Sequence, residues 1–140
     1  MVIAIDGPAG SGKSTIARLL AERLAAKGGS QGPFTYINSG NLYRAVTLGC
    51  VRKGIPVTDA ERALEYAKSA DIEYRDKSVF LDGEDVTELL HSDEIDKNSA
   101  PLSAIVPIRH VINDLIRKIA AGCNAVLEGR DMTTVVFPNA

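Results

Sequence analysis

The stretch Val2–Thr15, VIAIDGPAGSGKST, determines the fold class of this chain. It begins with a short apolar run, continues with the spacing Gly-x4-Gly-Lys-Ser, and leads into a helical pattern of apolar residues. This order of strand, glycine-rich loop and helix is that of the Walker A motif, in which successive backbone N–H groups surround a polyphosphate. We therefore predict a nucleoside triphosphate site made by Gly7, Pro8, Ala9, Gly10, Ser11, Gly12, Lys13, Ser14 and Thr15.

Two residues of this motif have specific chemical roles. Lys13 is expected to reach the β- and γ-phosphates, and the hydroxyl of Ser14 is expected to bind Mg²⁺. The helix that follows directs the positive end of its dipole at the anion. GTPases, ATPases and small-molecule kinases all use such a loop, so the remaining chain has to distinguish between them.

Helical periodicity recurs along the chain after the loop. Thr58 and Glu61 form a capping box, and Pro107 suits the first turn of a helix with a strong apolar stripe. The buried, apolar face of the first helix is expected to contain Ile16, Leu19, Leu20 and Leu24, with Ala17, Ala21 and Ala25 beside it. The predicted helices are 13–27, 40–54, 58–69 and 107–121, with shorter helical pieces over 87–104.

Strand patterns separate these helices. Val2–Asp6, Phe34–Asn38 and Asn124–Gly129 are short apolar runs, typical of strands buried in a parallel sheet. Residues 71–87 alternate and carry charged turns, which predicts small antiparallel strands. The expected fold is α/β, a single P-loop NTPase-type domain over 1–140 with a parallel sheet flanked by helices and an antiparallel β insert over about 71–104. Ligands of such sheets bind beyond the carboxyl ends of the strands, where we find Asp6, Asn38 and Glu128.

The composition limits the classes of partner. The chain has 140 residues, of which 45% are hydrophobic and 24% charged, and a formal net charge of −2. This charge argues against a broad nucleic-acid surface, and no apolar run reaches the roughly 18 residues of a membrane span. Because a strand pattern follows Met1 without a basic leader, we expect a cytoplasmic protein. Cys50 and Cys123 are then expected to be reduced, mostly buried thiols without a catalytic or metal-binding role.

Charged groups outside the loop indicate a second phosphate site. Arg44 follows the second strand by one helical turn, Arg109 lies near the start of the last helix, and Glu128–Asp131, EGRD, follows the last buried strand. Glu128 has the place of a Walker B acid and is expected to hold Mg²⁺ through the water shell of the metal, beside the hydroxyl of Ser14. Taken alone, each arginine also fits the pattern of a solvated surface residue, and the segment EGRD also fits that of a polar turn. Transfer between two phosphates, however, requires guanidinium groups in addition to the loop lysine.

Four stretches in this order, IAIDGPAGSGKST, TYINSGNLYRAV, LDGEDVTELL and EGRDMTTVVFP, resemble bacterial cytidylate kinase. The resemblance covers essentially the whole chain, and the four motifs together are far more specific than the Walker loop alone. It implies a monomeric enzyme that passes the γ-phosphate of ATP to CMP or dCMP with Mg²⁺, without nucleic acid or membrane partners. It also implies that the insert over about 71–104 belongs to the acceptor-binding region.

The resemblance implies roles for individual residues as well. Arg44 and Arg130 would hold the phosphate of the acceptor and act with Lys13 in catalysis, while Ser39, Arg109 and Asp131 would face the cytosine. Cytosine presents an exocyclic amine from which a carboxylate accepts a hydrogen bond, whereas uracil presents an acceptor there. Because a mismatch of buried polar groups rejects an analogue strongly, Asp131 is the candidate for distinguishing CMP from UMP.

The chain departs from the family pattern at several positions. Asn38 stands where the family usually has Asp, Glu128 replaces a usual Asp, and Ala100 aligns with a usual contact serine. The sequence stops after VVFPNA, where the family continues with another strand, an arginine-bearing lid and a final helix, so we expect a C-terminally truncated kinase domain. An open sheet edge there would promote self-association. Two alternatives follow: a nucleotide-binding module without turnover, and a different small-molecule kinase on the same scaffold.

Overall fold

The fold is described from a computed structural model, which covers residues 1–7, 12–26, 34–75, 78–129 and 132–140. The chain forms two compact units. The first contains Met1–Ser39 and Ile116–Ala140, and the second contains Gly40–Leu115. The phosphate loop and the segment EGRD therefore belong to the first unit, and the predicted insert belongs to the second.

The first unit is built on a parallel sheet of three strands, β1 (Val2–Asp6), β6 (Asn124–Gly129) and β2 (Phe34–Asn38). The strand order is β1-β6-β2, so the last strand in sequence lies between the first two. Asp6 is the partner of Gly129 in this register, and Asn38 is the partner of Glu128. The predicted parallel sheet is confirmed, and its polar residues gather at the carboxyl ends of the strands.

Helix α1 (Lys13–Ala26) packs on this sheet through small side chains. Ala17 and Ala21 are buried against Val126, with Leu20 and Leu24 partly buried beside them. The prediction that Ile16 and Leu19 share the buried face is wrong, because these side chains are 59% and 44% exposed. Apolar residues extend around most of this helix, and the alanine ridge allows the closest approach to the sheet.

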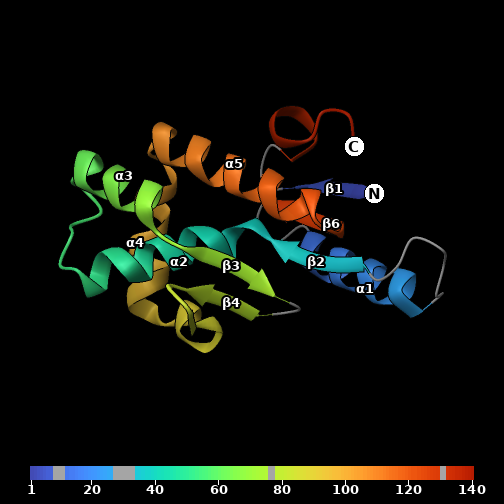
Figure 1. Ribbon diagram of the computed structural model, residues 1–140, viewed down its shortest axis with the longest axis horizontal. Helices are drawn as coiled ribbons and strands as arrows, with labels where there is room; N and C mark the ends of the chain where they lie inside the picture. The colour runs from blue at the N-terminus through green and yellow to red at the C-terminus, as the bar shows by residue number, and fades with distance from the viewer. Residues whose placement is uncertain (8–11, 27–33, 76–77, 130–131) are drawn as a thin grey trace. The chain divides into compact units, whose positions relative to one another are not determined.

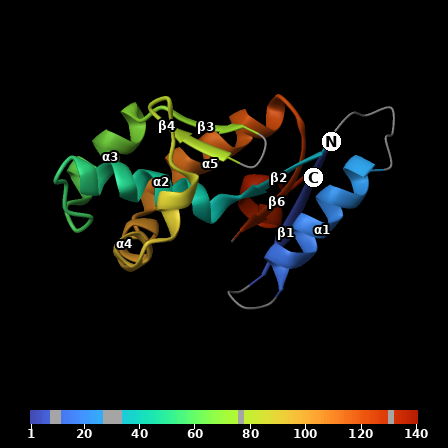
Figure 2. The same cartoon turned by 90° about the horizontal axis from the view of Figure 1, so that it is seen from below.

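A short helical segment that the sequence does not predict, η2 (Met132–Val136), packs against β1 and β6. It is a single turn of π-helix, in which the N–H of Phe137 donates to the carbonyl of Met132 over 2.8 Å. The guanidinium of Arg117 donates to the carbonyls of Val135 and Val136 over 3.0 Å each. Figures 1 and 2 show α1 and η2 on opposite sides of β1, so elements of the chain flank both faces of the sheet there.

The second unit combines helices with a small antiparallel sheet. The strands β3 (Ile72–Arg75), β4 (Ser78–Leu81) and β5 (Glu84–Asp85) pair in that order, which confirms the predicted small antiparallel sheet. Its helical segments are, in chain order, α2 (Ser39–Arg52) from Gly40 on, α3 (Ala60–Ser69), the 3₁₀ turn η1 (Thr87–His91), α4 (Asp93–Ser103) and α5 (Val106–Ala121) up to Leu115.

The start of α3 differs from the sequence prediction. The cap is Asp59, whose carboxylate accepts a hydrogen bond from the N–H of Arg62 over 3.2 Å. Thr58 therefore does not cap the helix, and the expected capping box is wrong by one residue. Threonine and aspartate are both good N-caps, so the sequence alone does not determine which of these two adjacent residues begins the helix.

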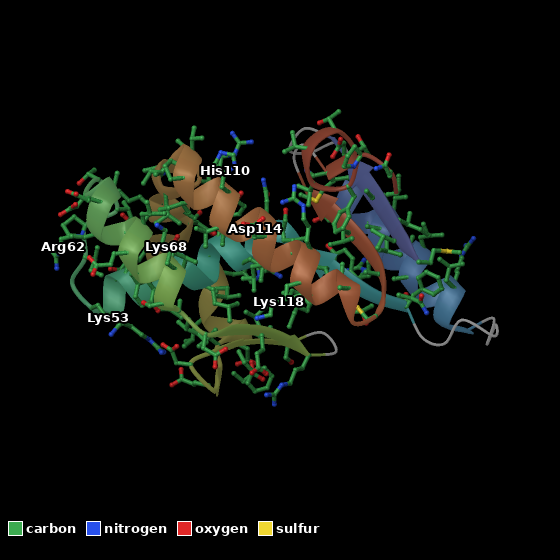
Figure 3. The ribbon with its side chains drawn as sticks, turned by 45° about the horizontal axis from the view of Figure 1, so that its top comes forward. Lys53, Arg62, Lys68, His110, Asp114 and Lys118 are labelled. Carbon is green, nitrogen blue, oxygen red and sulfur yellow. The ribbon has the colours of Figure 1, made fainter. Side chains whose placement is uncertain are left out.

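The core of the second unit follows the predicted apolar stripe of α5. Ile108 and Ile112 are fully buried, whereas His110 and Asp114 lie on the exposed side of the helix (Figure 3). No described helix combines the length and the apolar character that a membrane span requires. Other buried side chains of this unit include Leu42, Val46, Ala63, Val79, Leu81, Leu90, Ile95 and Leu102.

Candidate functional site

The structure describes both ends of the predicted phosphate loop. Gly7 directly follows β1, and Gly12 directly precedes α1, where its carbonyl accepts from the N–H of Ile16 over 3.1 Å. Gly12 has a φ of 85°, a left-handed conformation that favours glycine. The predicted strand before the motif and the predicted helix after it are confirmed, while Pro8–Ser11 lie outside the described residues.

Ser14 and Glu128, the two predicted magnesium ligands, lie in direct contact although 114 residues separate them in sequence. The hydroxyl of Ser14 donates to Oε1 of Glu128 over 2.7 Å, and the hydroxyl of Tyr36 donates to the same oxygen over 3.1 Å. Glu128 is only 2% exposed. The first turn of α1 and the carboxyl end of β6 therefore present one cluster of oxygen atoms, in which Glu128 is buried, Tyr36 is half-buried and Ser14 is exposed.

The second carboxylate oxygen of Glu128 distinguishes this cluster from an ordinary buried hydrogen bond. Oε2 is buried and has no hydrogen-bond partner among the described residues. An unsatisfied buried carboxylate oxygen is costly unless a cation or donor approaches it. Carboxylate and hydroxyl oxygens are hard ligands of the kind Mg²⁺ prefers, and Mg²⁺ needs only one or two of them beside phosphate and water. The residues present thus fit the metal that the Walker motif implies, and the described residues contain no group of three or more His, Cys, Asp or Glu suited to a metal.

Tyr36 belongs to this cluster but was missed by the sequence analysis. Burial, together with the charge and the hydrogen bond of Glu128, raises the pKa of Tyr36 to about 12. Its phenol therefore remains a neutral donor at physiological pH. Alternation along β2 carried a signal, because Tyr36 lies two residues before Asn38 on the same face of the strand.

Asp6, at the end of β1, fixes the segment that follows EGRD. Its carboxylate accepts hydrogen bonds from the N–H of Met132, from the N–H of Thr133 over 3.1 Å, and from the Thr133 hydroxyl. Partial burial acts to raise the pKa of Asp6, but the bonds from Thr133 and Met132 outweigh it and hold the pKa below its ordinary value. Asp6 thus anchors η2 to the carboxyl edge of the sheet.

This anchor should make stability depend on pH. Since the pKa of Asp6 is lowered on folding from 3.8, its contribution is present above that value and is lost as pH falls through the lower folded pKa. We expect Asp6→Asn to lower the free energy of unfolding at pH 7 by about 0.5–1 kcal/mol. The loss is small because water competes for the hydrogen bonds of this exposed carboxylate. Urea unfolding at pH values from 7 to 3 measures the difference in free energy of unfolding between the parent and Asp6→Asn. This difference should shrink as the pH falls below the ordinary pKa of an aspartate. Asp71→Asn, at an exposed position, is the control, and a difference that does not change with pH would contradict the role of Asp6.

Ser39, a predicted acceptor residue, lies against Gly129. Ser39 is 4% exposed and begins α2, and a Cβ on Gly129 would lie 2.0 Å from its hydroxyl oxygen. Gly129 therefore allows the serine to reach the carboxyl end of β6. Arg130 and Asp131, the next two residues, lie outside the described residues.

The remaining predicted acceptor residues, Arg44 and Arg109, belong to the second unit. Nε of Arg44 donates to Oδ1 of Asp96 over 3.2 Å, and Arg109 is half-buried in the first turn of α5. Ala100, the departure from the family's contact serine, is exposed on α4. The neighbouring Ser99 and Ser103 donate to backbone carbonyls of their own helix.

Comparison with known proteins identifies the family of this chain. The family model described as cytidylate kinase matches residues 3–140. A relative named cytidylate kinase from Caldanaerobacter subterraneus is 46% identical, and the match covers 99% of this chain and 58% of the relative. Another of the same name, from Clostridioides difficile, is 36% identical, and the match covers 100% of this chain and 61% of the relative. A third, from Alkaliphilus oremlandii, is 40% identical over 99% of this chain and 60% of its own length. The chain thus spans about 60% of the length of these curated relatives, and it belongs to the cytidylate kinase family.

Proposed function

We propose that this chain acts as a nucleoside monophosphate kinase that transfers the γ-phosphate of ATP to CMP or dCMP. The observation that supports this most directly is the contact between Ser14 and Glu128. It joins the end of a Walker A motif to a buried carboxylate with one unpartnered oxygen, in a chain of the cytidylate kinase family. We also propose that the reaction takes place in the cytoplasm, where both nucleotides occur, as a step of pyrimidine metabolism.

On the donor side, the loop Gly7–Thr15 binds the phosphates of ATP and Lys13 reaches the β- and γ-phosphates. Ser14 and Glu128 are the residues that would hold Mg²⁺, which would neutralise negative charge on the phosphates. Tyr36 donates a hydrogen bond to Oε1 of Glu128 and so would orient the carboxylate and leave Oε2 available to the metal and its water shell.

On the acceptor side, Arg44 and Arg130 bind the phosphate of CMP through their guanidinium groups. Ser39, Arg109 and Asp131 face the base, and Asp131 accepts a hydrogen bond from the exocyclic amine of cytosine. These assignments rest on the match of the chain's motifs to the family. UMP presents a carbonyl to the same carboxylate, so two acceptors would face each other.

The chemistry needs no nucleophile from the protein. A phosphate oxygen of CMP attacks the γ-phosphorus of ATP, the bond from that phosphorus to the bridging oxygen breaks, and CDP and ADP result. Lys13 and the arginines align the two nucleotides and stabilise the charge that spreads over the transferred group.

The test is turnover with each nucleoside monophosphate. The chain is incubated with ATP, Mg²⁺ and CMP, dCMP, UMP or AMP, and ADP formation is measured beside calorimetric binding of CMP. We expect transfer to CMP and dCMP, and a preference for CMP over UMP that falls about tenfold or more in Asp131→Ala. Transfer to UMP or AMP but not to CMP would refute the substrate assignment. Binding of ATP and CMP without ADP formation would instead identify a nucleotide-binding module.

A further inference from the structure

Arg44 is held by a carboxylate that the proposed reaction does not use. Nε of Arg44 on α2 lies 3.2 Å from Oδ1 of Asp96 on α4, and both residues belong to the second unit. The side chains are 28% and 50% exposed, and 52 residues separate them in sequence. This pairing is therefore a product of the fold and not of local sequence.

Both partners project from helices that are fixed in place. Leu42 and Ala45, on either side of Arg44 in α2, are fully buried. Ile95, directly before Asp96, is 2% exposed, and the hydroxyl of Ser92 caps α4 by accepting from its N–H over 3.3 Å. The separation of the two side chains is thus determined by packed backbone, as a positioning contact requires.

The contact uses only one of the donors of the guanidinium. An arginine has five N–H groups, one on Nε and four on the two terminal nitrogens. Asp96 accepts from Nε, on the side of the group nearest the stem. The four terminal N–H groups form the fork that binds a phosphate through two parallel hydrogen bonds.

We propose that Asp96 is a positioning residue, which orients the Arg44 guanidinium for the phosphate of the acceptor nucleotide. The proposal rests on the proposed function, because it takes the acceptor role of Arg44 from there. Stability does not explain the pair, since ion pairs this exposed contribute little to folding. What the pair does is to restrict a long side chain before the phosphate arrives, so that less conformational freedom is lost on binding.

Charge repulsion between Asp96 and the phosphate opposes this effect. The guanidinium lies between the two anions when the phosphate occupies the terminal nitrogens, and its positive charge offsets the repulsion. Asp96 is half exposed, so water and salt screen what remains. The orienting effect is therefore expected to exceed the repulsion.

Calorimetric titration of CMP into the whole chain tests this without a need for turnover. Asp96→Ala is expected to weaken CMP binding roughly three- to tenfold and to leave the affinity for ATP unchanged. Asp96→Asn should weaken it by less than about twofold, because an amide oxygen still accepts from Nε. In the Arg44→Ala background, Asp96→Ala should have no further effect.

The matched control is a second ion pair of the same unit. Arg52 and Glu84 lie 2.8 Å apart with side chains 42% and 56% exposed, and neither has a role in the site. Glu84→Ala should leave CMP affinity unchanged. The proposal is overturned if Asp96→Ala binds CMP as well as or better than the parent, or if the effect persists in the Arg44→Ala background. If the parent does not bind CMP, or if Arg44→Ala binds it normally, the acceptor role of Arg44 fails and this inference fails with it.

Discussion

Replacing Glu128 by alanine should lower kcat/KM for phosphoryl transfer by about 100-fold or more. The carboxylate lies on the central strand β6, is buried, and accepts a hydrogen bond from Ser14 at the end of the phosphate-loop motif. Its Oε2 has no hydrogen-bond partner among the described residues, which is the state expected of an oxygen that receives a cation on ATP binding. Initial rates measured over a range of Mg²⁺ concentrations should show that Glu128→Ala needs far more metal than the parent.

Two variants separate the charge of Glu128 from its packing. Glu128→Gln keeps the shape and should lose activity nearly as severely, because an amide is a poor ligand for Mg²⁺ in place of a carboxylate. Tyr36→Phe removes only one hydrogen bond to Oε1 and should lose about two- to tenfold. An unchanged magnesium requirement in Glu128→Gln would exclude this residue as a metal ligand.

Stability gives an independent reading of the same position. A buried carboxylate oxygen without a partner lowers the stability of the folded protein, so Glu128→Gln should unfold at the same urea concentration as the parent or a higher one. Loss of activity without loss of stability would show that the carboxylate is kept for function. A large loss of both would indicate a structural role.

The sheet and the insert were predictable from the sequence because their signals are local. Each strand of the parallel sheet is a short apolar run next to a turn, and parallel strands bring their carboxyl ends to one edge. On that basis Asp6, Asn38 and Glu128 are predicted at the carboxyl edge of the parallel sheet, and the pairing register of the strands confirms it. The Walker spacing fixed the place of Ser14 at the start of α1.

The remaining features depend on tertiary contacts. Ile16 and Leu19 are apolar but exposed, because small alanines on another face of α1 determine how close the helix lies to the sheet. The π-turn η2 is anchored by Asp6 and Arg117, which are distant from it in sequence. Tyr36 joins the site only because β2 pairs with β6. A pattern of residues that are close in sequence does not predict such contacts between distant parts of the chain.

The second large effect is expected from Gly129→Ala. A Cβ at this position would lie 2.0 Å from Oγ of Ser39, 3.1 Å from its Cβ, and 3.1 Å from Cε of Met132. Because Ser39 and Met132 are themselves buried, neither can move aside without displacing its neighbours. We expect the free energy of unfolding to fall by about 1–3 kcal/mol and CMP binding to weaken at least tenfold, since Ser39 is proposed to face the acceptor. Urea unfolding and calorimetry on the same samples measure the two effects.

A second substitution separates the steric effect from the functional one. Gly129→Ala combined with Ser39→Ala removes the contact at 2.0 Å and leaves the two at 3.1 Å, so most of the stability should return. CMP affinity should remain low, because the double variant lacks the Ser39 hydroxyl that is proposed to face the acceptor. Gly122→Ala, where a Cβ would meet only a carbonyl oxygen at 3.8 Å, should change stability by no more than about 0.5 kcal/mol. If the double variant instead recovers CMP binding together with stability, Ser39 only fills space beside Gly129 and takes no part in holding the acceptor.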